Sequence, residues 1–295
     1  MRLSRSGLLA LAVVYLVWGS TFLTIRLAVI GDSFTPFALA AIRTFCAGLC
    51  LLALGAWQRH RLWIGARDFG WLLFTGMLLW VGGHSLLVWA SQRVDSGLAA
   101  LLFASIPLWS YVLTWRQRPW CAREFMPVAI GFVGVALVLP LGAGDSLALD
   151  PASVRDGALV LFSAFLWSLG SVLGIHERIP VAVASGYQLL FAGLANAAIA
   201  VALGAGIGHP DTRAWLACLY LVLPGCVLAF LAYSHALRVL PLPLVMSFAY
   251  VNPLVAVALG ALVLGEHLSA RATAGCAVVL GSVFWLLRAQ ERRKV

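Results

Sequence analysis

The sequence predicts an all-α polytopic membrane protein with ten transmembrane helices. Of its 295 residues, 62% are hydrophobic and only 11% are charged. Apolar runs recur along the whole chain, and most approach the roughly 20 residues that a helix needs to cross the hydrocarbon layer. Short segments that carry charges, glycine or proline separate these runs. The chain therefore has the composition of a protein that crosses a bilayer many times.

The apolar windows and their interruptions place the individual spans. We expect the first run to be retained rather than cleaved as a signal peptide, because it stays apolar to about Ile30 without a cleavage site of small residues. The expected spans are 7–30, 36–57, 69–91, 96–115, 124–141, 157–176, 181–206, 213–236, 241–263 and 269–288.

The distribution of basic residues predicts the orientation. If the N-terminus is cytoplasmic, most of the 20 Lys and Arg residues fall in cytoplasmic segments, as the positive-inside rule requires. Both termini are then cytoplasmic, and the acidic segment 142–156 is an extracytoplasmic connection. The net charge of +9 does not indicate a nucleic-acid partner, because no basic stripe interleaved with aromatic residues occurs.

Short motifs recur in the same order in the two halves of the chain. Five spans per half is an odd number, so the second half must enter the membrane from the opposite side. The sequence therefore predicts two inverted repeats of five helices, at 7–141 and 157–289, a plan on which many secondary transporters are built. The matching pairs are Trp18-Gly19-Ser20 with Trp167-Ser168-Leu169-Gly170-Ser171, Pro36 with Pro180, Ala47-Gly48-Leu49 with Ala192-Gly193-Leu194, Arg93-Val94 with Arg238-Val239, and Ile106-Pro107-Leu108 with Asn252-Pro253-Leu254.

Two prolines mark corresponding spans as interrupted helices. Pro107 and Pro253 lie near the middle of apolar segments, where a proline removes a backbone donor and frees a carbonyl. In hydrocarbon such a carbonyl needs a partner from the protein or from water. We expect both helices to break where they face a polar cavity, with the two prolines shaping it.

Aromatic and polar side chains at similar depth are the candidates for lining that cavity. Trp18 and Trp167 match across the two halves and lie near the predicted midplane, whereas tryptophans are more usual at the membrane interfaces. An aromatic lining with a few polar groups suits amphipathic or aromatic solutes and organic cations. The alternative is that these side chains only pack helices together. The candidates are Trp18, Trp80, His84, Trp109, Trp167, Tyr187, Tyr250 and Asn252.

Two arginines and one histidine are the notable ionisable groups inside the spans. A charge within the hydrocarbon indicates a transport pathway or a paired structural charge. Arg26 either has such a role or extends to the outer surface. Arg43 either binds an anionic group or braces the carbonyls of a broken helix. His84 is a candidate for proton coupling, or it is hydrogen-bonded to a neighbouring helix.

Several classes of protein do not fit the sequence. The six cysteines form no CxxC pair, which argues against a zinc site or a disulfide framework. No Walker A motif, HExxH or GxSxG occurs, so we expect neither ATP hydrolysis, a catalytic site, a cofactor nor a bound metal. The partners expected are a small-molecule solute and the lipid bilayer.

A set of short motifs runs along the chain: Tyr15-Leu16-Val17-Trp18-Gly19-Ser20-Thr21-Phe22, Ile25-Arg26, Pro36, Arg43, Ala47-Gly48, Ser96-Gly97-Leu98-Ala99-Ala100, Pro107-Leu108, Tyr250-Val251-Asn252-Pro253 and Leu264-Gly265-Glu266. In these motifs the sequence resembles the EamA family of the drug/metabolite transporter superfamily. The resemblance implies two EamA repeats of five helices and export of small metabolites, amino acids or drugs across a bacterial inner membrane. Together with the inverted repeat, it favours a secondary-active exporter that works by alternating access, and passive facilitation of the same solutes is the alternative.

Overall fold

The computed structural model describes residues 4–114, 122–138, 151–174, 179–240, 245 and 248–291. Across these residues the secondary structure is helical, apart from one isolated antiparallel bridge between Phe34 and Gly208. Seven helical stretches are long and apolar enough to cross a membrane, and three further apolar helices are shorter within the described part of the chain. The prediction of an all-α, polytopic membrane protein is confirmed for the residues described.

The helices follow one another in two series. The first series is α1 (Arg5–Val29), α2 (Pro36–Trp57), α3 (Ala66–Gly76), the π-helix η1 (Met77–Ser85), α4 (Leu86–Ala90), α5 (Ser96–Phe103), α6 (Ile106–Thr114) and α7 (Ala122–Val138). The second is α8 (Pro151–Leu173), α9 (Val181–Ala202), α10 (Thr212–Tyr220), the π-helix η3 (Leu221–Leu228), α11 (Ala229–Val239), α13 (Phe248–Leu264) and α14 (Ala270–Glu291).

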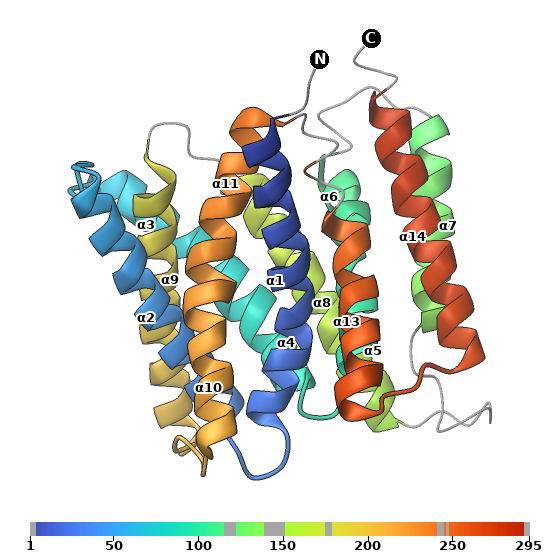
Figure 1. Cartoon of the computed structure of the whole chain (residues 1–295), viewed down its shortest axis with the longest axis horizontal. Coiled ribbons are helices and arrows are strands. Elements are labelled where there is room, and N and C mark those ends of the chain that lie inside the picture. The colour runs from blue at the N-terminus through green and yellow to red at the C-terminus, as the bar shows by residue number, and fades with distance from the viewer. Residues whose placement is uncertain are drawn as a thin grey trace.

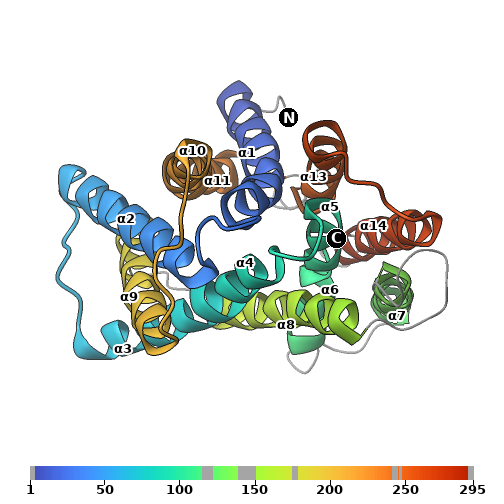
Figure 2. The same ribbon diagram turned by 90° about the horizontal axis from the view of Figure 1, so that it is seen from below.

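The helices form one bundle with a pair of helices at each flank. Helix α1 begins and α14 ends at the same end of the bundle, at the top of Figure 1, which we call the termini end. At the opposite end, the far end, α1 turns into α2, α4 into α5, and α13 into α14. Helices α2 and α9 pack together at one flank and α7 and α14 at the other (Figure 2).

Helices α1 and α8 lie between the two flanks, on opposite sides of the bundle (Figure 2). Helix α1 contacts α10, η3, α11 and α13, whereas α8 contacts η1, α4, α5 and α6. Each of these two helices thus packs against one span that contains a π-helix and against one span that contains a proline.

The third and eighth spans are less regular than the sequence predicts. In each, a π-helix lies between two α-helical segments. Pro224 within η3 has no N–H to donate to the helix, and Ser85 at the end of η1 donates its hydroxyl to the Trp80 carbonyl at 2.9 Å. π-helical turns shift the hydrogen-bond ladder by one residue and are frequent at functional sites.

The two proline-bearing spans differ from each other. Between α5 and α6 the helix is interrupted at Ala104 and Ser105, just before Pro107. Ser168 of α8 donates its hydroxyl to the Ile106 carbonyl at 3.1 Å, so a neighbouring helix satisfies a carbonyl at the break. This is the interruption expected beside Pro107.

Helix α13, by contrast, continues through Pro253 from Phe248 to Leu264. Pro253 is close to the start of this helix, and its ring and missing donor affect only the first turn of the described segment. Within residues 248–264 the expected break at Pro253 is therefore absent, and residues 246 and 247 lie outside the part described.

Close contact between α2 and α9 depends on glycines. A Cβ added to Gly48 would lie 2.7 Å from the Leu190 backbone nitrogen, and one added to Gly193 would lie 2.7 Å from the Phe45 Cα. Small residues of this kind let transmembrane helices approach closely.

We predict that Gly48→Ala destabilises the protein although alanine is the better helix former. Overpacking costs about 1–3 kcal/mol, and alanine recovers at most about 1 kcal/mol of helix propensity. The matched control is Gly70→Ala in α3, where an added Cβ meets nothing within 4 Å. Thermal unfolding in detergent should show a lower Tm for Gly48→Ala than for Gly70→Ala. Equal values would mean that the two helices are not tightly packed.

Candidate functional site

Five of the residues singled out in the sequence lie around the two π-helices. We call them the central cluster: Trp18 on α1, Arg43 on α2, Trp80 and His84 on η1, and Trp167 on α8. Direct contacts join them to one another or to η3, as the following paragraphs describe.

Arg43 is buried, with 4% of its surface exposed. Its Nη1 contacts the Nε2 of His84, and its Nε donates to the Cys226 sulfur of η3 at 3.3 Å. A guanidinium can only donate hydrogen bonds, so Nε2 of His84 is the acceptor and the ring is uncharged. Arg43 therefore carries a positive charge whose two described partners are neutral.

Aromatic side chains extend from His84 across the bundle. The Trp80 ring lies edge-on to His84, with centroids 5.7 Å apart, and edge-on to Trp167 at 5.2 Å. Trp167 also contacts Phe103 of α5, which in turn contacts Phe22 of α1, each at 6.0 Å. These tilted and edge-to-face arrangements are the favoured ones for aromatic pairs.

Trp18 reaches the same region from α1. Its indole N–H donates to the Gly225 carbonyl of η3 at 3.1 Å, and its ring packs against Tyr233 and Phe248 with centroids 5.1 and 5.2 Å away. Trp18 and Arg43 thus contact adjacent residues of η3, Gly225 and Cys226. The matched tryptophans Trp18 and Trp167 do not touch in the structure, and Phe22 and Phe103 lie between their helices.

Trp109 and Tyr187 lie apart from this cluster. Trp109 packs against Phe132 and Phe165, 4.8 and 5.5 Å away, in a separate aromatic group between α6, α7 and α8. The Tyr187 hydroxyl donates to the Leu62 carbonyl at 3.2 Å, in the connection from α2 to α3 near the termini end.

Two more candidates are on α13. Asn252 is 8% exposed, and its side-chain oxygen has no hydrogen-bond partner within the described residues. Tyr250 belongs to α13 by its backbone, but its side chain lies outside the part of the structure that is described.

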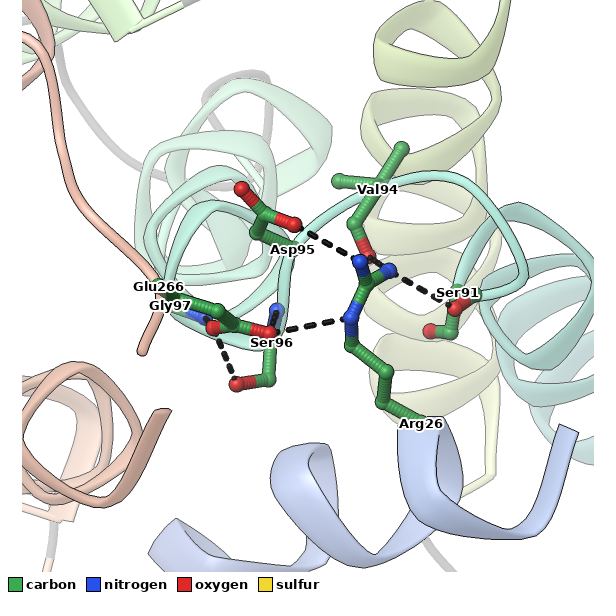
Figure 3. Close-up of polar contacts among 7 residues, drawn as sticks. All are labelled: Arg26, Ser91, Val94, Asp95, Ser96, Gly97 and Glu266. Carbon is green, nitrogen blue, oxygen red and sulfur yellow. Dashed lines mark hydrogen bonds and ion pairs between the residues drawn. The ribbon is translucent and has the colours of Figure 1, made fainter. Parts of the chain in front are cut away.

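A second polar site lies at the far end and was only partly anticipated (Figure 3). Arg26, in the last turn of α1, has a side chain that is 13% exposed. Its Nη1 donates to the carbonyls of Val94 and Ser91, at 2.7 and 3.3 Å, and its Nη2 pairs with Asp95 at 2.8 Å. In the structure Arg26 is a paired charge, and its guanidinium contacts the connection between α4 and α5.

Glu266 joins the same network from the connection between α13 and α14. Its Oε1 forms an ion pair with the Arg26 Nε at 2.9 Å and accepts from the Ser96 backbone N–H at 3.0 Å. Its Oε2 accepts from the Ser96 hydroxyl at 2.6 Å and from the Gly97 N–H at 3.3 Å. A carboxylate at the first turn of α5 satisfies free N–H groups and is favoured by the helix dipole.

Glycines shape the approach of Glu266 to α5. Gly265 adopts a φ of 65°, in the left-handed region that favours glycine. A Cβ on Gly260 would collide with the Glu266 carboxylate and the Ser96 hydroxyl. We call Arg26, Asp95, Ser96 and Glu266 the far-end network. It connects the end of α1, the start of α5 and the connection between α13 and α14, which are distant in sequence. The Leu-Gly-Glu motif pointed to Glu266, whereas the role of Asp95 depends on a loop whose path the sequence does not specify.

The protonation of Asp95 is sensitive to this environment. Burial raises the pKa of the Asp95 carboxyl above its usual range; the Arg26 guanidinium opposes this, and the Glu266 carboxylate adds to the rise. The side chain is 42% exposed, so solvent screens these interactions.

No group of three or more metal-ligating side chains occurs among the described residues. Cys46, Cys50, Cys218, Cys226 and Cys276 are free thiols, and Cys121 lies outside the described residues. Two surface pockets lie at the far end, with volumes of about 420 and 270 Å³. The smaller one borders Asp95 and Asp156, the latter paired with Arg93 and Arg155.

Comparison with known proteins identifies the family. The model of the EamA-like transporter family matches the chain twice, at residues 5–139 and 157–288. The chain belongs to the EamA-like transporter family. The inner membrane transporter YedA of Escherichia coli K12, itself described as uncharacterized, is 32% identical over 268 residues, which cover 88% of this chain and 83% of YedA.

The chain is also similar to other proteins. The protein PecM of Dickeya dadantii is 27% identical over 276 residues, covering 90% of this chain and 87% of PecM. A solved crystal structure superimposes with a TM-score of 0.69 at 19% identity, over 98% of this chain and 99% of the other. The two proteins therefore share the same fold over nearly their full length.

We predict that Glu266→Gln loosens the far end locally. The amide loses the ion pair with Arg26 and the charge-assisted bonds to the start of α5, which are worth about 1.5–3 kcal/mol each. Hydrogen–deuterium exchange in peptides covering residues 91–100 should become roughly tenfold faster or more.

The matched control for this experiment is Asp211→Asn. Asp211 caps α10 by accepting from the Ala214 N–H at 2.8 Å. Asparagine keeps this acceptor and is an equally good N-cap, so this substitution should leave exchange over 91–100 unchanged. Unchanged exchange over 91–100 in Glu266→Gln would show that Glu266 does not hold the loop between α4 and α5.

We also predict a pH dependence that arises from Asp95. Because its pKa is higher in the folded protein, its contribution to stability is fully present below about pH 4 and is lost as the pH rises through the raised pKa. The Tm of the wild type should therefore fall relative to that of Asp95→Asn as the pH is raised from about 4 to 7. A relative increase would show that attraction by Arg26 outweighs burial.

Proposed function

We propose that this chain is a secondary-active exporter of small metabolites in a bacterial inner membrane, with both termini in the cytoplasm. Its solutes are amino acids or other amphipathic and aromatic compounds, and organic cations are a further candidate class. Membership of the EamA-like family and the relation to an inner membrane transporter support transport and location. The same family makes catalysis the less favoured function.

Alternating access around the central cluster is the proposed mechanism. Two inverted repeats would place equivalent spans on either side of a site near the midplane. The two family matches, and the packing of α1 and α8 against corresponding sets of helices, support this plan. The two π-helices, in the third and eighth spans, would then be equivalent elements that flank the site.

The observation that carries the proposal is the far-end network. Arg26 and Glu266 tie α1, α5 and α13 together at one end of the bundle. Arg26 is eight residues after Trp18 on the same helix, about 12 Å along its axis. In our proposal these contacts form the outer gate, which must part for a solute to leave the central cluster.

Transport in proteoliposomes tests the proposal. We expect saturable flux of at least one labelled aromatic amino acid in the wild type and roughly a tenfold lower kcat/KM in Trp167→Leu, because its aromatic contact with Trp80 is lost. The control is Trp57→Leu, the same substitution at a side chain that is 81% exposed, which should leave the flux unchanged.

An imposed pH gradient then distinguishes proton-coupled export from passive facilitation. Flux that collapses when the gradient is removed indicates a proton-coupled exporter, whereas saturable flux without this dependence favours passive facilitation. Equal flux in wild type and Trp167→Leu would contradict the central cluster as the solute site.

A further inference from the structure

We propose that Arg43 binds the carboxylate of the transported solute. The substrates are then small carboxylates with an apolar or aromatic body, and organic cations without a carboxylate are excluded. This inference rests on the proposed transport function and names its substrate class.

The first argument is the charge of Arg43. Arg26, Arg93 and Arg155 each form an ion pair with a carboxylate, whereas no described carboxylate lies within 4 Å of Arg43. A buried charge inside the membrane is costly unless it is paired. Among the described residues its partners are the neutral His84 and the Cys226 thiol, so an anionic solute would complete the site.

The second argument is the donor capacity of the guanidinium. Its Nε and Nη1 are engaged, but Nη2 has no hydrogen-bond partner among the described residues. Gly225 lies beside this nitrogen, and a Cβ added there would be 3.8 Å from it. Because Gly225 has no side chain, none is placed against this edge of the guanidinium, and arginine binds carboxylates through such edges.

The third argument is the composition of the surroundings. Trp80 lies against His84 and Trp167, so aromatic faces lie next to the charged group. A solute with a carboxylate at one end and an apolar or aromatic body at the other matches both features. An organic cation would also stack on these rings, but the positive charge of Arg43 repels it in a medium where charges are poorly screened.

Arg43 is enclosed in this conformation, with 4% of its surface exposed. A solute therefore reaches it only after one end of the bundle opens. The far-end network is a set of contacts whose separation would open one such route.

Three labelled aromatic probes of similar size test the inference in proteoliposomes: 3-phenylpropanoate, L-phenylalanine and phenethylamine. The wild type should transport at least one of the two carboxylates and should not transport phenethylamine. In Arg43→Gln the KM for the carboxylate should rise roughly tenfold or more, as expected when a charge-assisted hydrogen bond is removed. Arg43→Lys should retain part of the preference for carboxylates over phenethylamine.

The control variant is Arg67→Gln, which removes an arginine from the exposed start of α3 and should leave the fluxes unchanged. If Arg43→Gln does not fold, the three probes still decide the question in the wild type alone. Transport of phenethylamine at a rate similar to that of the carboxylates overturns the inference, as does an unchanged carboxylate preference in Arg43→Gln.

Two further outcomes separate this inference from the proposed function. Saturable transport of phenethylamine alone overturns the role of Arg43 and leaves the transport function standing. No saturable flux of any probe overturns both.

Discussion

The structure depends on one constraint, which is that each backbone N–H and C=O group in the hydrocarbon layer needs a partner inside the protein. Regular helices satisfy this constraint with hydrogen bonds inside the helix. At two of the irregular segments, side chains from other elements supply the partner: Ser168 bonds the Ile106 carbonyl at the break between α5 and α6, and Trp18 bonds the Gly225 carbonyl of a π-helix. These two segments are therefore also points of contact between distant parts of the chain.

The same constraint explains why polar groups gather at two levels of the bundle. At the far end, Arg26 and Glu266 satisfy carbonyls and N–H groups where helices end, and they neutralise each other. At the central cluster, Arg43 has neutral partners. At the far end the opposite charges are paired, as in a structural network. At Arg43 no described opposite charge is present, so in our proposal this site retains the capacity to bind an anion.

Helix α1 carries residues of both the central cluster and the far-end network. It carries Trp18, which contacts η3, and Arg26, which contacts the loop between α4 and α5 and the loop after α13. A movement of α1 relative to α13 would therefore change both the central cluster and the far end. In the proposed transport cycle, this shared helix couples the opening of the gate to the state of the binding site.

The sequence by itself determined the class of the fold, because long apolar runs admit only helices in a bilayer. It also identified Arg26 and Arg43 as charges that need partners, the interruption beside Pro107, and the family. Only the tertiary structure decided the partners. Glu266 accepts a hydrogen bond from Ser96, 170 residues away. Trp109 and Tyr187 lie apart from the central cluster. The two π-helices were likewise not predicted, since local apolar composition does not reveal a shifted ladder. The physical reason is that core-facing and lipid-facing surfaces are both apolar in a membrane, so periodicity does not fix how each helix is rotated or which neighbour it meets.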